Sequence, residues 1–123
     1  MAVERVFVYG TLMPGQSRWP SLEPFAAAHQ PATAKGVLYD TGRGYPAAVF
    51  PDDAGAGDIP GVVVMLDPKR VGQAIALLDA IEGEGSLYAR VTISTTAGDA
   101  ISYEWLASTD GFARLPDGWQ PTP

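Results

Sequence analysis

Two features of this 123-residue sequence could carry chemistry: a glutamate at the end of a predicted helix and a glycine-containing loop after a predicted strand. At about 100° per residue, Glu82 falls on the apolar face of the helix, between Val71 and Ile75. Burial and the negative end of the helix dipole both disfavour a charged carboxylate there, so its pKa should rise toward neutrality. A general acid/base needs such a pKa. The helical periodicity alone leaves open that Glu82 rotates into water beside Gly83.

The loop Tyr9-Gly10-Thr11-Leu12 follows a strand that reads as buried. Gly10 permits close approach of a ligand to the main chain. Successive N–H groups in such a turn suit a carboxylate, or an oxyanion that develops during acyl transfer. The loop by itself is equally consistent with a plain glycine between a strand and a loop.

The elements that must position these residues are short strands and one main helix. The helix is predicted from an N-cap at Asp67 and a first residue at Pro68 to about Glu82, with Gly83 just beyond. Residues 16–30 are ambiguous, and 25–28 are consistent with a helical turn. A flexible glycine-rich loop is predicted at 53–58, a hairpin turn around Gly98-Asp99, and an irregular tail from about 108. The predicted strands are 3–9, 34–39, 47–50, 61–66, 88–95 and 100–107.

This pattern predicts a single α+β domain over 1–123. Its expected architecture is a small mixed β-barrel or sheet of about six strands, with one main helix packed outside.

Composition excludes several classes of function. The chain has no cysteine, so disulfides, thiolate metal sites and a cysteine nucleophile are excluded. With His29 as the only histidine, we expect no metal site. The net charge is −6 and the basic residues are scattered, which argues against nucleic acid as a partner. The sequence has no apolar run long enough to span a membrane and nothing like a signal peptide, so we expect no membrane partner and a cytoplasmic protein.

Five sequence motifs together resemble the gamma-glutamyl cyclotransferase-like family, and they occur in the family's order between Val6 and about Leu106. The first and fourth are the most specific in combination. The motifs are residues 6–12 (VFVYGTL), 44–47 (GYPA), Gly61 at the start of a strand, 78–83 (LDAIEG) and 87–90 (LYAR).

The resemblance implies a small mixed barrel with helices outside and a small gamma-glutamyl substrate, with no cofactor. The substrate's alpha-amine would attack its own gamma-carbonyl, releasing 5-oxoproline and a free amine. Glu82 matches the family's catalytic glutamate, which moves protons in turn. The backbone of residues 9–12 would hold the glutamyl moiety.

Three further residues are candidates for the pocket. The resemblance places Tyr88 near it, with its hydroxyl available as a donor. Arg90 shares a strand face with Tyr88 and either anchors a carboxylate or forms a surface or structural ion pair. Tyr45 is either a pocket residue or packing before Pro46.

Two other functions stay open at this stage. The same chemistry could remove a gamma-glutamyl cap in a specialised biosynthetic pathway, or a non-catalytic barrel could bind an amino-acid-like ligand. The chain departs from the family's pattern at residues 13–15 and 84–86, near the expected position of the leaving amine. The sequence determines neither the leaving amine nor the oligomeric state.

Overall fold

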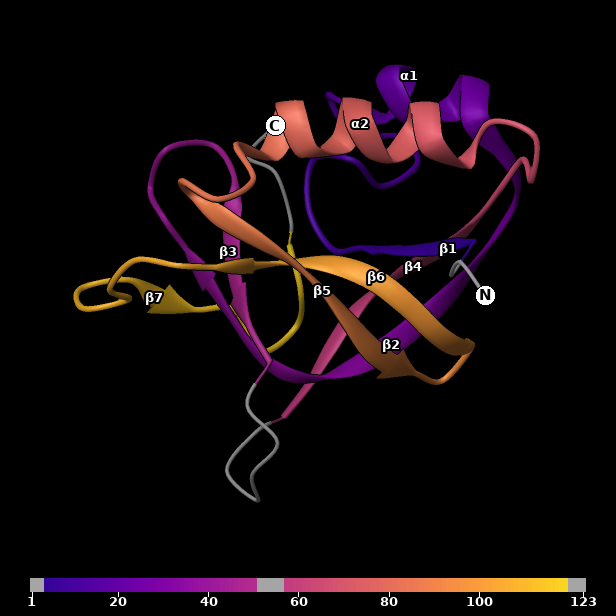
Figure 1. Ribbon diagram of the computed structural model, residues 1–123. Helices are drawn as coiled ribbons and strands as arrows, with labels where there is room; N and C mark the ends of the chain where they lie inside the picture. Colours follow the sequence, from indigo (N-terminus) through magenta and orange to yellow (C-terminus); the bar gives the residue numbers. More distant parts are fainter. Residues whose placement is uncertain (1–3, 51–56, 120–123) are drawn as a thin grey trace.

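The structure is a computed structural model that describes residues 4–50 and 57–119. These residues form seven strands, two short helical regions and one main helix, which packs on the outside of the strands (Figure 1). Residues 51–56, most of the loop predicted at 53–58, lie outside the described residues. The elements in chain order are β1 (Arg5–Val8), α1 (Trp19–Leu22), the 3-10 helix η1 (Glu23–Phe25), β2 (Ala26–Asp40), β3 (Pro46–Val49), β4 (Gly57–Leu66), α2 (Val71–Glu82), β5 (Tyr88–Thr95), β6 (Gly98–Trp105) and β7 (Ala113–Arg114).

Five of the strands close into a barrel. Their order is β2, β4, β1, β6 and β5, and β5 returns to β2 through the Ala34–Thr95 pair. The sheet is mixed because β1 and β6 run parallel whereas the other pairs are antiparallel. Strands β3 and β7 add to the far end of β2, outside the closed ring. The predicted mixed barrel with its main helix outside is confirmed (Figure 1).

Strand β1 is buried on both faces. Val6 and Val8 belong to a core that also contains Ala74 and Leu78 of α2, so one face of the strand packs beneath the helix. Phe7 belongs to a second core that contains no helical residue and fills the barrel. This double burial explains why residues 6–8 are all apolar and do not alternate with polar residues.

Helix α2 begins three residues later than an N-cap at Asp67 would require, at Val71 rather than Pro68. Residues 67–70 form a turn instead, in which the Asp67 carboxylate accepts the N–H of Lys69 at 3.0 Å. The other end is as predicted: Gly83 follows with a left-handed φ of 65°, and its N–H donates to the Asp79 carbonyl. The apolar stripe is also confirmed, with Ala74 and Leu78 fully buried.

Strand β2 is the largest correction to the prediction. It runs for 15 residues and includes Ala26–Gln30, which was expected to hold a helical turn and an unassigned segment. Most of these residues are small or polar and exposed, so no alternation marks them as a strand. Pairing with β4 decides their conformation, since ladder positions run from Ala26–Leu66 to Gly36–Gly57.

The C-terminal third also differs in detail. Strand β6 begins at Gly98, so the hairpin turn lies at Thr96-Ala97 rather than around Gly98-Asp99. The tail expected to be irregular contributes β7, which pairs with β2 through Tyr39–Arg114 and Asp40–Ala113.

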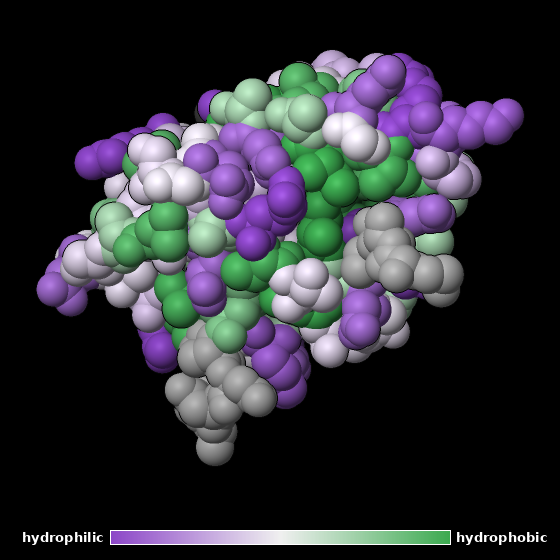
Figure 2. All heavy atoms as spheres, in the orientation of Figure 1, coloured by the Kyte–Doolittle hydropathy of each residue, from purple (hydrophilic) through white to green (hydrophobic). Residues whose placement is uncertain are grey.

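The face of the molecule that Figure 2 shows carries both hydrophobic and hydrophilic side chains. Figure 2 shows hydrophobic side chains reaching the surface near the middle of the face, below the helices, with hydrophilic side chains around them. Within residues 4–50 and 57–119, no helix has the length and apolar character needed to cross a membrane.

We expect Gly61→Ala to lower the free energy of unfolding by about 1–3 kcal/mol. A Cβ at Gly61 would lie 2.5 Å from the Val8 carbonyl oxygen and 2.7 Å from the Phe7 ring. Gly57→Ala in the same strand is the matched control, because a Cβ there meets nothing within 4 Å. Urea unfolding of both variants measures the difference, and equal effects would contradict the close packing of β1 against β4.

Candidate active site

A pocket opens where β1 ends and α2 ends, enclosing about 590 Å³ with its open mouth included. It contains seven of the eight residues expected at the site from sequence; the exception is Arg90. The lining residues are Phe7, Val8, Tyr9, Gly10, Thr11, Leu12, Arg18, Tyr45, Pro46, Ile81, Glu82, Leu87, Tyr88 and Tyr103.

Glu82 is the last residue of α2, and its side chain lines this pocket rather than open water beyond Gly83. Burial raises the pKa of its carboxyl from the ordinary value of 4.5 to about 7, and the nearby positive charge of Arg18 opposes this by lowering it. Removal from water destabilises the charged carboxylate more than the attraction of one exposed guanidinium stabilises it. Near neutral pH the carboxyl can therefore either accept or give up a proton.

The loop after β1 turns sharply and presents its main chain to the pocket. The N–H of Met13 donates to the Gly10 carbonyl at 3.1 Å, and the N–H of Arg18 donates to the Thr11 carbonyl at 2.8 Å. Within the described residues, the N–H groups of Gly10, Thr11 and Leu12 have no protein acceptor. Neighbouring main-chain donors without a protein acceptor are the kind of groups that bind negatively charged oxygens in proteins.

Gly10 is required by a close approach to the chain opposite. A Cβ at this position would lie 2.6 Å from the Pro46 ring. Pro46 is held in turn by Tyr88, whose hydroxyl donates to the Pro46 carbonyl at 2.6 Å. The Tyr88 proton is therefore already used within the protein, which corrects the expectation that it is available to a substrate. Tyr45, beside Pro46, lines the pocket and is half-buried.

Two more tyrosine hydroxyls at the pocket also donate their hydrogen bonds to oxygen atoms of the protein. Tyr9 donates to the main-chain carbonyl of Tyr103 at 2.6 Å, and Tyr103 donates to Asp79 at 2.7 Å. Burial raises the pKa of Tyr9, Tyr88 and Tyr103 well above the usual value of 10. The three side chains hold the walls of the pocket and stay protonated.

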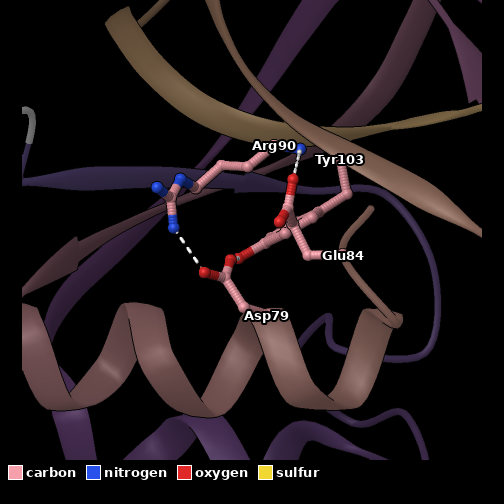
Figure 3. A network of polar contacts seen from close by, with 4 residues as sticks. All are labelled: Asp79, Glu84, Arg90 and Tyr103. Carbon is pink, nitrogen blue, oxygen red and sulfur yellow. Dashed lines mark hydrogen bonds and ion pairs between the residues drawn. The ribbon is translucent and has the colours of Figure 1, made fainter. Parts of the chain in front are cut away.

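Arg90 lies outside the pocket lining, and Figure 3 shows what it contacts instead. Its guanidinium forms an ion pair with Asp79 on α2, and the main-chain N–H of Arg90 donates to the Glu84 carboxylate at 3.4 Å. Asp79 receives the Tyr103 hydroxyl on its other oxygen. The sequence left open whether Arg90 anchors a carboxylate or forms a surface or structural ion pair. The structure shows the ion pair.

This network connects α2 to the barrel one turn before Glu82. Sequence reasoning placed Asp79 at the edge of the solvent face and did not select Tyr103. The signal was present in the hairpin, because Arg90 and Tyr103 are direct partners across β5 and β6. Only the packing of α2 on that pair shows that Asp79 meets both.

Arg18 is the other lining residue that the sequence analysis missed. It lies just before α1 and is the one cation among the residues that line this pocket. In residues 4–50 and 57–119, no three His, Cys, Asp or Glu side chains gather in a way that could hold a metal ion.

Comparison with known proteins agrees with this fold. The family model described as "Gamma-glutamyl cyclotransferase, AIG2-like" matches residues 6–120. The chain is 32% identical over 120 residues to the "Gamma-glutamylcyclotransferase family protein YtfP" of Escherichia coli K12, covering 93% of both chains. The chain therefore belongs to the gamma-glutamyl cyclotransferase, AIG2-like family.

Solved structures share the fold. An AIG2-like protein from Mus musculus superposes with a TM-score of 0.77 at 17% identity, covering 98% of this chain and 90% of that one. YkqA from Bacillus subtilis superposes with a TM-score of 0.68 at 26% identity. That match covers 93% of this chain but 38% of YkqA, so this chain spans well under half of that relative.

We expect Glu82→Gln to stabilise the protein increasingly as pH rises from 4.5 to about 7. The folded protein binds the Glu82 proton more tightly than the unfolded chain, so wild-type stability falls through this window. Gln is neutral and does not titrate, so the free energy of unfolding of the variant relative to wild type should increase by about 1–3 kcal/mol between pH 4.5 and pH 8. Unfolding titrations at both pH values measure it, with the exposed Glu84→Gln as control. A pH-independent difference would mean that Glu82 is well solvated.

We expect Tyr88→Phe to lower the free energy of unfolding by about 1–2 kcal/mol, because the buried Pro46 carbonyl loses its donor. The matched control is Tyr45→Phe, since the described residues show no hydrogen bond from the Tyr45 hydroxyl. Thermal unfolding of the two variants gives the comparison. Equal stability would show that the Tyr88 hydroxyl bond contributes nothing.

Proposed function

We propose that this protein is a gamma-glutamyl cyclotransferase, which releases 5-oxoproline and a free amine from a gamma-glutamyl substrate. The observation that carries the proposal is the pairing of two groups in one pocket. Glu82 has a pKa of about 7, and the loop at Gly10–Leu12 offers N–H groups without protein acceptors. Membership of the family adds to it.

The reaction begins with binding of the glutamyl group against the loop. Main-chain N–H groups of Thr11 and Leu12 are suited to hold an oxygen that gains negative charge as the gamma-carbonyl is attacked. Gly10 lets the loop lie close to Pro46, because a Cβ there would collide with the proline ring.

Glu82 then moves two protons. As a carboxylate it takes a proton from the substrate's alpha-ammonium, and the freed amine attacks the gamma-carbonyl carbon. The new C–N bond closes a five-membered ring and leaves a tetrahedral oxyanion. When the oxyanion collapses, the bond to the leaving nitrogen breaks and protonated Glu82 gives its proton to that nitrogen. The ring nitrogen still carries two hydrogens, and it gives one to the regenerated Glu82 carboxylate, which passes it to the released amine. The products are the lactam 5-oxoproline and an ammonium ion, Glu82 is again a carboxylate, and no water molecule is consumed.

This chemistry asks for little else from the protein. The nucleophile belongs to the substrate, so no serine or cysteine of the chain has to form a covalent intermediate. A single carboxyl serves both transfers efficiently when its pKa lies near the working pH. The hydroxyl protons of Tyr9, Tyr88 and Tyr103 are committed to protein acceptors, which leaves the proton transfers to Glu82.

We expect wild-type protein to release 5-oxoproline from one or more members of a panel of gamma-glutamyl dipeptides and amines, and Glu82→Gln to lose at least about 100-fold in rate. Gln keeps the shape of the side chain but cannot carry the proton. Chromatographic detection of 5-oxoproline provides the measurement.

The control is Glu84→Gln, which removes an exposed carboxylate two residues away and outside the pocket lining. It should retain wild-type turnover. Retention of wild-type rates by Glu82→Gln would refute the proposed role, and circular dichroism of that variant excludes misfolding as the cause of a loss.

A further inference from the structure

The mouth of the pocket carries an unassigned positive charge. Of the lining residues, only Arg18 and Leu87 are exposed, so these two form the rim. The other members of the lining are buried or half-buried. A group that extends from the reacting centre toward solvent must pass this rim.

The backbone of Arg18 is fixed in place. Its N–H donates to the Thr11 carbonyl at 2.8 Å, which ties it to the substrate loop. It also directly precedes α1 and its carbonyl accepts the N–H of Ser21 at 3.0 Å. The long side chain therefore starts from a defined point beside the pocket.

Its guanidinium has no acidic partner in the described part of the chain. The ion pairs there are Lys35 with Asp58 and Arg90 with Asp79. The one carboxylate in the pocket lining is Glu82, and the positive charge of Arg18 acts on it over a distance without a hydrogen bond or ion pair. An arginine at the rim without an acidic partner is suited to bind a carboxylate through bidentate hydrogen bonds.

We propose that Arg18 binds a carboxylate on the leaving amine, so that the preferred substrates are gamma-glutamyl amino acids rather than gamma-glutamyl amines without an acid group. This deepens the proposed function and rests on it. The leaving nitrogen must lie near Glu82, and what it carries points outward to Arg18. The glutamyl half of the substrate lies deeper, against the loop at Gly10–Leu12.

Leu87 adds a second element of selectivity at the same rim. Its side chain is 39% exposed, an unusual position for a large apolar residue in this protein. An amino acid whose carboxylate contacts Arg18 can place an apolar side chain against Leu87. Gamma-glutamyl-leucine is therefore the probe, and gamma-glutamyl-leucinamide is its neutral counterpart, differing only in the terminal carboxylate.

The test is the ratio of kcat/KM for gamma-glutamyl-leucine to that for gamma-glutamyl-leucinamide, in wild type, Arg18→Gln and Arg18→Lys. We expect Arg18→Gln to lower this ratio about 10-fold, as for loss of a charged hydrogen-bonded pair. Arg18→Lys should recover part of it. The assays are run at pH 9, because loss of Arg18 removes an effect that lowers the pKa of Glu82.

A ratio unchanged in Arg18→Gln would overturn the proposal. An equal loss on both substrates would also overturn it, because Arg18 would then act on the glutamyl half or on Glu82. Calorimetric binding of the two ligands to Glu82→Gln, with and without Arg18→Gln, gives a readout that needs no turnover. A binding preference for the acid that depends on Arg18, with no 5-oxoproline formed by wild type, would refute the proposed function and keep the carboxylate site.

Discussion

The structure depends on the burial of β1 on both of its faces. Val6 and Val8 pack under α2, and Phe7 packs inside the barrel, so the strand joins the helix layer to the sheet. It also forms a parallel pair with β6, whereas its pair with β4 is antiparallel. The chain leaves this fixed strand directly into the loop at Gly10. The loop is therefore anchored to a strand that is buried on both faces, which is what the proposed anion site requires.

The stability of the protein and its proposed chemistry pull in opposite directions at Glu82. Placing a carboxyl at the buried end of a helix costs free energy whenever it is ionised, since neither water nor an adjacent cation fully compensates the charge. The same cost brings its pKa to about 7. Arg18 moderates this from the rim, and its exposure to solvent keeps the effect smaller than that of burial. Sites that need a shifted pKa commonly carry such a local penalty.

The surroundings of Glu82 are rigid for reasons unrelated to proton transfer. Each of three buried tyrosine hydroxyls donates to a protein oxygen at 2.6 or 2.7 Å and thereby links separate elements. Tyr88 links β5 to Pro46, and Tyr103 links β6 to Asp79 on α2. Asp79 also pairs with Arg90, so the last turn of the helix is attached to the hairpin through two side chains (Figure 3). This attachment fixes the helix end from which Glu82 projects.

The sequence by itself determined the features that depend on neighbours along the chain. Helical periodicity placed Glu82 on the apolar side and Gly83 at the helix end, and an apolar run followed by glycine marked β1 and its loop. These follow from spacings of a few residues, which a sequence displays directly. The mixed barrel with an outer helix followed from the order of such elements and from the family resemblance.

Only the tertiary structure decided what depends on partners distant in the chain. The 15-residue length of β2 comes from pairing with β4, and the segment itself has no strand pattern. Arg90 meets Asp79 rather than the pocket because α2 packs across the hairpin, and Tyr88 gives its proton to Pro46, which lies 42 residues away. Arg18 reaches the rim because its backbone is bonded to the loop. Such pairings arise when the chain closes on itself, and local residue spacing carries no record of them.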